Sequence, residues 1–497
     1  MAPLQQTVEC LWYGSVMEAM NRFPQSIHFI GAAGRGMAPV MAAVADQGVL
    51  VSGSENSETY GATMAWLSRR GIHVARTFSA DNLAHCPGLV VIGRTFERGN
   101  PEVEAVLSQH LAYTSLAEFI GHYVLNGCTN VLVAGSKGKS TTTAMLVEIL
   151  EYAQLAPGYL IGGFPRNGRP PARFGGTLNV IEADDYSTLW WNHHPKFLYY
   201  RPSIIVLTNV YPDHTEVHGD RAGSWRNFST LIQQLPQDGL ILIADSRGSA
   251  VPSWLIAESP CEIVMLDELV CHQPIMVPSR FDVDGNRFRW QDTLFRLSVP
   301  GRVNAINALS ASFAAGRLGV TEQQCADALE GFEGVGERMD VFPAGADRWI
   351  YCDCFGYLPE SLAANIASIR ETHPGLGVTL VYQMRQIDRL AEAQESFVRV
   401  LSSCDEVILT SYPRPKVTLV PEMDPAYLEG LIHRVRRHKS QNGDTFAAGT
   451  SICYVPDLRS VVQELGDRCN PGVTLFSVHA RYRDPLVRLL GTLGCST

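Results

Sequence analysis

The chain has 497 residues, 46% of them hydrophobic and 18% charged, which is typical of a globular protein with two to four domains. Its formal net charge of −10 argues against a general nucleic-acid-binding protein. We find no apolar run of about 18 residues and no secretory signal, so we expect a cytoplasmic protein without a membrane span. The 12 cysteines form no Cys-x-x-Cys pair, which favours reduced thiols over disulfides or a zinc site.

Strands and helices alternate around a glycine-rich turn near the start of the chain. Strands are predicted at 27–30 and 49–52, with a helix over about 38–47 between them. The turn after the first strand, Gly31 to Met37, suits a pyrophosphate. Its spacing is G-x-x-G-x-G rather than G-x-G-x-x-G, so a tight turn without a ligand stays open as the alternative. A further strand at 89–92 should end on the same edge of a parallel sheet, where ligands bind.

The strongest motif lies in residues 130–150. An apolar run at 131–134 predicts a buried strand, and apolar residues at helical spacing follow the loop Gly135-Ser136-Lys137-Gly138-Lys139-Ser140-Thr141. A strand, a glycine loop and a helix in this order form a phosphate cradle, in which Lys139 meets the β/γ-phosphates and Ser140 ligates Mg²⁺. The standard motif has a glycine where this chain has Val133, so a glycine turn with a chance Lys-Ser remains the alternative.

Two later strands end in polar side chains. The strand at 178–181 leads into Glu182-Ala183-Asp184-Asp185, and an apolar strand that ends in acids is where a P-loop enzyme places its metal carboxylate. Glu182 is the best candidate, against the alternative of helix-capping acids on a solvated loop. The strand at 203–207 ends at Thr208 to His214. His214 is a candidate metal ligand, phosphate contact or acid–base group, and a structural role is equally open.

The remaining sequence continues the α/β pattern. Strands at 239–244 and 261–266 and short strands in 270–298 precede a helix that starts near Gly301 and carries Asn304 and Asn307 on one face, suited to an adenine edge or to capping. The last third predicts another alternating α/β domain, with candidate linkers near 116–127 and 334–344. Its expected strands lie at 349–353, 378–382, 406–409, 417–420 and 474–478, and its helices at 359–371, 390–401 and 485–493.

These motifs, in this order, resemble the Mur ligases, three-domain ATP-dependent amide-forming enzymes of peptidoglycan assembly. The similarity is greatest to the members that join UDP-N-acetylmuramate to L-alanine or to a preformed tripeptide. The short P-loop, Glu182 to Tyr186, and Thr208 to His214 are the most specific matches. The resemblance implies three α/β domains. These are a Rossmann-like UDP-substrate domain (1–120), a central P-loop ATPase-type domain with a parallel sheet (121–340), and a Rossmann-like amine-substrate domain (341–497).

The resemblance also implies the reaction and the residues that perform it. ATP phosphorylates a carboxylate, and an amine then attacks the acyl phosphate to give an amide, ADP and phosphate. The implied catalytic residues are Lys139, Glu182, His214 and Arg338, and the implied Mg²⁺ ligands are Ser140, Thr141, Glu182 and His214. ATP would be bound by Gly135, Ser136, Lys137, Gly138, Lys139, Ser140, Thr141, Asn304 and Asn307. The substrates would be bound by Gly34, Arg35, Gly36, Met37, Ser52, Asn100 and Arg385.

The third domain departs from the family pattern. Where the resembling ligases carry an Asp-rich segment with two histidines, this chain has Cys352 to Pro359, with Tyr357 and Leu358 at the histidine positions. We therefore expect the partners to be a small-molecule carboxylate and an amine or peptide, with an amine other than L-alanine. Three alternatives stay open: a relative recruited to a specialised-metabolite pathway, a non-catalytic nucleotide-binding descendant and, from the first glycine turn alone, a nucleotide-dependent oxidoreductase.

Overall fold

The computed structural model describes most of the chain and shows three α/β sheets. The described residues are 23–57, 60–211, 215–245, 249–257, 259–266, 287–290, 292–299, 301–343, 348–384, 394–411, 425–442, 451–455, 457–466, 472–479 and 486. They divide into two compact units, the first carrying two of the large sheets and the second carrying the third. Each unit is described by itself.

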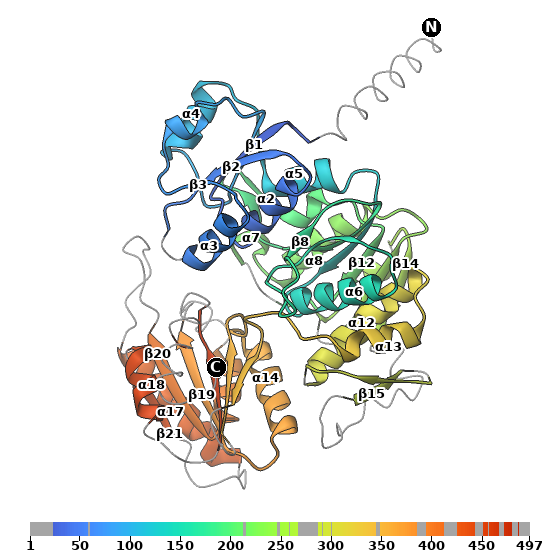
Figure 1. The fold of residues 1–497 in the computed structure, drawn as a ribbon. Helices are drawn as coiled ribbons and strands as arrows, with labels where there is room; N and C mark the ends of the chain where they lie inside the picture. The colour runs from blue at the N-terminus through green and yellow to red at the C-terminus, as the bar shows by residue number, and fades with distance from the viewer. Residues whose placement is uncertain are drawn as a thin grey trace. The chain divides into compact units, whose positions relative to one another are not determined.

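The first sheet has five parallel strands in the order β3-β2-β1-β4-β5. Because β1 pairs with both β2 and β4, the strand order reverses there, and such a switch point leaves a crevice at the carboxyl ends of the two strands. The strands are β1 (Ser26–Ile30), β2 (Leu50–Ser54), β3 (Val74–Ala75), β4 (Leu89–Ile92) and β5 (Tyr113–Ser115). The helices are α2 (Met37–Ala45), α3 (Gly61–Arg69) and α4 (Pro101–Ser108) (Figure 1).

The second sheet has seven strands in the order β14-β13-β12-β6-β9-β7-β8, all parallel to their neighbours except β8. Its central strands are apolar and buried, as expected of a parallel sheet covered by helices. The strands are β6 (Thr129–Ala134), β7 (Gly158–Leu160), β8 (Ala172–Arg173), β9 (Leu178–Glu182), β12 (Ile204–Leu207), β13 (Leu240–Ile243) and β14 (Glu262–Met265). The longer helices are α6 (Lys139–Tyr152), α8 (Arg221–Ile232), α12 (Arg302–Arg317) and α13 (Glu322–Glu330).

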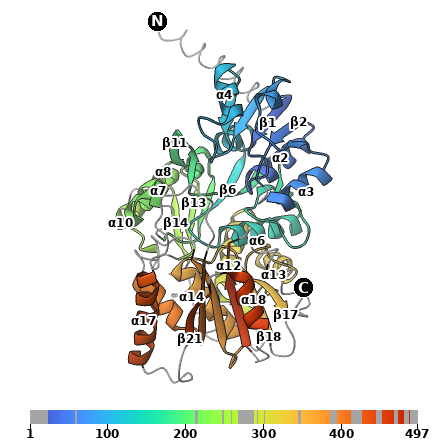
Figure 2. The same ribbon diagram turned by 90° about the vertical axis from the view of Figure 1, so that its left-hand side faces the viewer.

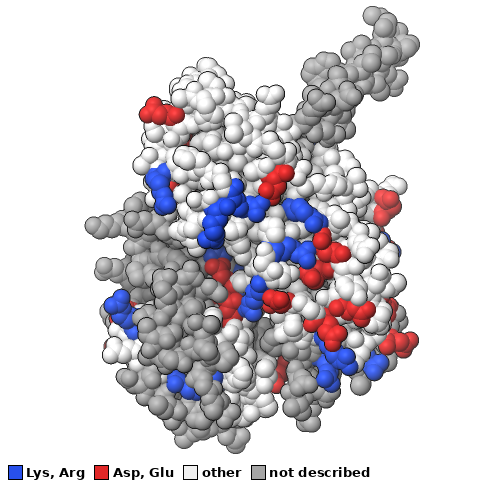
Figure 3. Space-filling model, in the orientation of Figure 1, with Lys and Arg blue, Asp and Glu red and all other residues white. Residues whose placement is uncertain are grey.

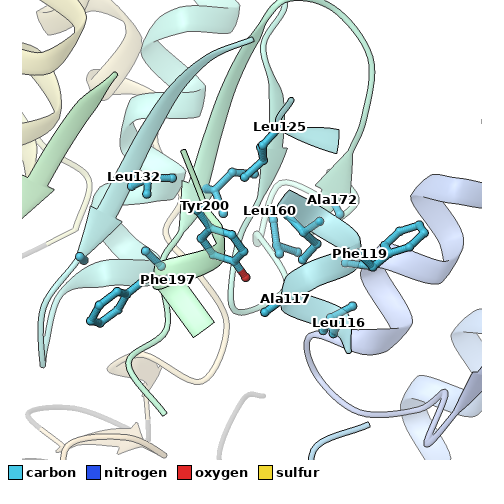
Figure 4. Close-up of a cluster of buried hydrophobic side chains, with 14 of the residues drawn as sticks. Leu116, Ala117, Phe119, Leu125, Leu132, Leu160, Ala172, Phe197 and Tyr200 are labelled. Atoms are coloured by element: carbon cyan, nitrogen blue, oxygen red, sulfur yellow. The ribbon is translucent and has the colours of Figure 1, made fainter. Parts of the chain in front are cut away.

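A buried helical connector links the first two sheets. Helix α5 (Leu116–Phe119) starts with a capping box on Ser115 and continues into a π-helical turn, Ile120–Val124. Figure 4 shows Leu116 and Phe119 in one cluster of buried side chains with residues of the second sheet, such as Leu160. The predicted linker at 116–127 is therefore a packed element, and one hydrophobic core runs from the first sheet into the second.

The second unit contains a six-stranded sheet in the order β17-β18-β22-β19-β20-β21 (Figure 2). All its neighbouring strands are parallel except β17, which is antiparallel to β18. The strands are β17 (Asp340–Pro343), β18 (Arg348–Asp353), β19 (Val378–Met384), β20 (Glu406–Ser411), β21 (Ser451–Val455) and β22 (Gly472–Ser477). The helices are α14 (Pro359–Thr372), α16 (Gln394–Ser402), α17 (Pro425–Asn442) and α18 (Leu458–Gly466).

The α/β class and the alternating order are confirmed, with one to three residues of difference at most boundaries. The sequence did not predict helices α3, α8 and α13 in the first unit, or α17, β21 and α18 in the second. It predicted β15 (Arg287–Trp290) and β16 (Thr293–Arg296) only as part of a broad run of short strands. The strand predicted at 417–420 lies outside the described residues, as do most of the helix predicted at 485–493 and the start of the 270–298 run.

The described surface carries charges of both signs. In Figure 3, Lys and Arg side chains are interspersed with Asp and Glu on the face drawn. Within the described part of the chain, no helix combines the length and hydrophobicity needed to cross a bilayer.

Candidate active site

The loop between β6 and α6 has the shape of a phosphate cradle. Gly135 and Gly138 have φ values of 120° and 85°, a left-handed backbone that favours glycine. Gly138 is the residue before α6, so the loop leads directly into the helix N-terminus. The amide N–H groups of a first helical turn have no intrahelical acceptors, and they face an anion bound in front of them.

The end of β12 braces this loop from the side. Asn209 O accepts from Ser136 N at 3.0 Å, and the Asn209 side chain bridges the N–H and C=O of Lys137 at 2.9 and 3.0 Å. Thr208 Oγ1 donates to Lys137 O at 2.6 Å. A Cβ on Gly135 would lie 2.6 Å from Asn209 O, so the close approach itself requires glycine. The sequence places Thr208 and Asn209 in a motif of the resembling family, but it predicts no role for either residue.

Lys139 is held by an acid from the neighbouring strand. Its Nζ lies 2.6 Å from Gly135 O and 3.2 Å from Asp185 Oδ1, with both side chains largely buried. Asp185 Oδ2 lies 3.8 Å from Nε2 of buried His218, whose Nδ1 lies 2.8 Å from Asn227 Nδ2. The Asn227 amide and the Asp185 carboxylate therefore face the two ring nitrogens of His218. His218 was missed because nothing in the sequence distinguishes it from a structural histidine.

Ser140 and Glu182 bring a hydroxyl and a carboxylate together at the N-terminus of α6. Ser140 Oγ donates to Glu182 Oε1 at 2.9 Å, and Glu182 Oε2 accepts from Gly162 N at 2.6 Å. A hydroxyl and a carboxylate fit Mg²⁺, which takes few protein ligands and completes its octahedron with phosphate and water oxygens. Among the described residues, no group of three or more acidic, histidine or cysteine side chains is arranged to hold a metal ion.

The two predicted adenine contacts are placed differently. Asn307 in α12 is buried, and its Oδ1 would lie 2.8 Å from a Cβ on Gly138, so it packs against the phosphate loop itself. Asn304 belongs to the first turn of α12, where its N–H donates to Gly301 O at 2.9 Å, and it lies in the second unit. Thr141, in the first turn of α6, is half-buried beside Ser140. The adenine role of Asn304 stays a prediction.

The first sheet presents its glycine turn together with a buried acid. Glu55, directly after β2, accepts from the N–H groups of Ala33, Asn56 and Ser57, and its burial raises its pKa above the usual value. An acid at the end of the second strand of a βαβ unit is where a ribose hydroxyl is bound. Of the predicted substrate residues, Gly34 and Gly36 are half-buried and Arg35 is exposed in this turn, whereas Met37 is buried in the core.

Ser52 and Asn100 have structural hydrogen bonds. Ser52 Oγ lies 2.8 Å from His28 Nδ1 and 3.3 Å from His85 Nε2. Asn100 is the N-cap of α4, where its Oδ1 accepts from Glu102 N at 2.9 Å and from Val103 N at 3.2 Å. Their predicted contacts with a substrate stay predictions.

In the second unit, the segment after β18, which lacks the two histidines of the resembling ligases, makes an aromatic contact. The guanidinium carbon of Arg338 lies 3.5 Å from the centroid of the Phe355 ring. Asp353, at the end of β18, accepts from Phe355 N at 2.9 Å and from Asn365 Nδ2 at 2.6 Å. These contacts fix an acid and a guanidinium at the carboxyl edge of this sheet. His214 and Arg385 lie outside the described residues.

Comparisons with known proteins identify the family. A model described as "Mur ligase family, catalytic domain" matches residues 26–126, and one described as "Mur ligase middle domain" matches residues 133–315. The UDP-N-acetylmuramate–L-alanyl-γ-D-glutamyl-meso-2,6-diaminoheptandioate ligase of Haemophilus influenzae is 30% identical over 348 residues, 69% of this chain and 76% of that protein. The chain belongs to the Mur ligase family. With that family, it is an ATP-dependent ligase that forms amide bonds.

Other relatives match nearly the whole chain. The UDP-N-acetylmuramate–L-alanine ligase of Acidithiobacillus ferrooxidans is 29% identical over 477 residues, 93% of this chain and 96% of that protein. The crystal structure of UDP-N-acetylmuramate–alanine ligase from Thermotoga maritima superposes with a TM-score of 0.72 at 19% identity, covering 94% of this chain and 99% of that one. The second match shows a shared fold and no more. The resemblance inferred from the motifs is confirmed.

Proposed function

We propose that this Mur ligase activates a UDP-N-acetylmuramate-like carboxylate as an acyl phosphate and couples it to an amino acid or peptide. The observation that supports this most is the pairing of Lys139 with Asp185 and of Ser140 with Glu182 around the phosphate loop. Relatives that match most of the chain are named as ligases of UDP-N-acetylmuramate. The predicted domain limits and the cytoplasmic location remain part of this proposal.

Different residues at the edge of the second sheet would bind the phosphates, hold the metal ion and orient Lys139. The loop N–H groups and the α6 N-terminus bind the phosphates, while Lys139 turns from Asp185 to the transferring phosphoryl group. Ser140 and Glu182 would hold Mg²⁺, which supplies neutralisation of the charge on the phosphate oxygens. Asp185, with His218 beside it, would keep Lys139 oriented, because its buried carboxylate pairs with the ammonium at 3.2 Å. Positioning and charge neutralisation supply most of the catalysis.

The second unit favours an amine different from that of the relatives. Phe355 stacks on Arg338, and Tyr357 stands where the relatives carry a histidine. We therefore keep, as a second candidate, a Mur ligase recruited to another pathway with its own substrate pair. A nucleotide-binding descendant without turnover is the remaining alternative.

The test measures ADP release from Mg-ATP with UDP-N-acetylmuramate and a panel of amino acids and peptides. Turnover that requires both the acid and an amine supports the proposal. Turnover only with another carboxylate replaces the acid named here. Nucleotide binding without turnover on any pair of substrates would support the descendant instead.

A further inference from the structure

Two cations from different sheets of the first unit meet at one tyrosine ring. The guanidinium carbon of Arg94 lies 5.0 Å from the centroid of Tyr186, and its Nη1 lies 3.4 Å from Ser187 Oγ. Lys196 Nζ lies 4.0 Å from the same centroid and donates to the Tyr186 hydroxyl at 2.9 Å. Both distances fall within the range of cation–π attraction. Asp184 adds a negative charge beside the tyrosine and the lysine.

Arg94 stands at the ligand-binding edge of the first sheet. It follows β4 by two residues, and β4 pairs with β1 at the point where the strand order reverses. The glycine turn after β1 and Glu55 after β2 lie on the same edge. The Arg94 side chain is exposed, and the one hydrogen bond that it makes among the described residues, to Ser187, uses one of its five N–H donors.

Tyr186 belongs to the segment that carries the phosphoryl-transfer acids. It lies four residues after Glu182 and directly after Asp185, so its Cα is at most roughly 14 Å from that of Glu182. Arg94 therefore connects the ligand-binding edge of the first sheet to the segment after β9 that carries Asp185 and Tyr186. An acid that is bound on the first sheet and phosphorylated at the second must bring its carboxylate through this region.

We propose that Arg94 binds the carboxylate of the acid substrate, and that Lys196 is a positioning residue that holds the Tyr186 ring against the Arg94 guanidinium. This inference rests on the proposed function. A guanidinium binds a carboxylate through two parallel hydrogen bonds. One carboxylate oxygen attacks the γ-phosphorus, the bond from phosphorus to the bridging oxygen breaks, and ADP leaves with that electron pair. Arg94 keeps its hold on the other carboxylate oxygen during this step.

The burial of Lys196 supports a role beyond packing. An ammonium removed from water costs several kcal/mol unless partners compensate, and an apolar side chain would avoid that cost. Burial lowers the pKa of Lys196 to about 8, against the opposing effect of Asp184. Tyr186 and Asp184 are the partners that stabilise the charged form of Lys196. The Tyr186 ring also contacts the Arg94 guanidinium.

The experiment traps the acyl phosphate with hydroxylamine in the absence of an amine, using UDP-N-acetylmuramate and a panel of other carboxylates. Arg94→Gln should raise the KM for the acid by about 30- to 100-fold, since a charged hydrogen-bonding partner is lost, and leave the KM for ATP within about twofold. The matched control is Arg98→Gln, because Arg98 is an exposed arginine paired with Glu104. Lys196→Met should raise the KM for the acid by about tenfold, and Lys196→Arg should restore it.

The possible outcomes test separately the role of Arg94, the role of Lys196 and the proposed function. Hydroxamate formation by the wild type, with equal acid KM values in Arg94→Gln and Arg98→Gln, would overturn the role of Arg94 and leave the proposed function standing. If the KM for ATP rises as much as that for the acid in Lys196→Met, the lysine has no selective positioning role. No hydroxamate from the wild type with any acid would overturn both the proposed function and the inference that rests on it.

Discussion

Replacing Glu102 with glutamine should destabilise the first sheet by about 3 kcal/mol. Glu102 is fully buried in α4, and its carboxylate accepts from Ser54 Oγ and from Asn82 Nδ2, both at 2.5 Å, with His28 Nε2 at 3.5 Å. Burial by itself raises the pKa of Glu102, but the hydrogen bonds from His28, Ser54 and Asn82 outweigh it and hold the pKa below its usual value. A glutamine removes the negative charge that faces His28 and leaves one acceptor oxygen where the carboxylate has two.

Hydrogen exchange of peptides from β1 and β4 measures this effect locally, which suits a chain with several domains. At pH 7, Glu102→Gln should lose about 100-fold in protection, while Glu104→Gln, an exposed change on the same helix, should match the wild type. Because the pKa is lowered, the stabilisation is present above the unfolded value of 4.5 and is lost as the pH falls through the folded value. Equal protection in the two variants at pH 7 would refute this reasoning.

Three further outcomes are expected. Gly162→Ala places a Cβ 2.6 Å from the Glu182 carboxylate and should lower the rate of Mg-ATP turnover by about tenfold. The control, Gly61→Ala, has open space around the new Cβ and should keep the wild-type rate. Equal rates in the two variants would count against the Glu182 site. Gly138→Ala and Gly168→Ala impose similar backbone strain, but only the former meets Asn307, at 2.8 Å, so only it should weaken ATP binding in calorimetry. The pKa of Lys196 in the folded protein is about 8, below the usual lysine value of 10.5. Below pH 8 the charged Lys196 therefore destabilises the fold by about 3 kcal/mol. This cost disappears as the pH rises from 8 toward 10.5. Urea unfolding should therefore show Lys196→Met more stable than the wild type at pH 7 and no longer so near pH 10.

The sequence predicts the elements that carry strong local signals. The run Val131 to Ala134 is apolar at every position, which is typical of a strand buried on both faces. The glycines at 135 and 138 mark the phosphate loop, because its backbone adopts the positive φ values that favour glycine. The chemistry of Lys139, Ser140 and Glu182 follows from strand ends that meet on one edge of a parallel sheet. These features depend on residues close together in the chain, so a pattern of a few residues is enough to find them.

The partners of those residues could not be predicted in the same way. His218, Asn227 and Asn209 act through contacts made across the fold, and their residue types are common in loops and helix caps. Asn100 shows that a motif position can also have a structural role that the motif does not predict. Its side-chain oxygen, just before Pro101, accepts from two amide groups at the start of α4, while its predicted contact with a substrate stays a prediction.

The most direct test of the central claim compares Lys139→Ala with Arg98→Gln for ADP release in the presence of Mg-ATP, acid and amine. Lys139 is the cation of the phosphate loop, so its loss should lower kcat/KM by at least about 100-fold, while Arg98→Gln should match the wild type. A Lys139→Ala protein that retains full amide-forming activity would contradict the assignment of this loop as the site of phosphoryl transfer.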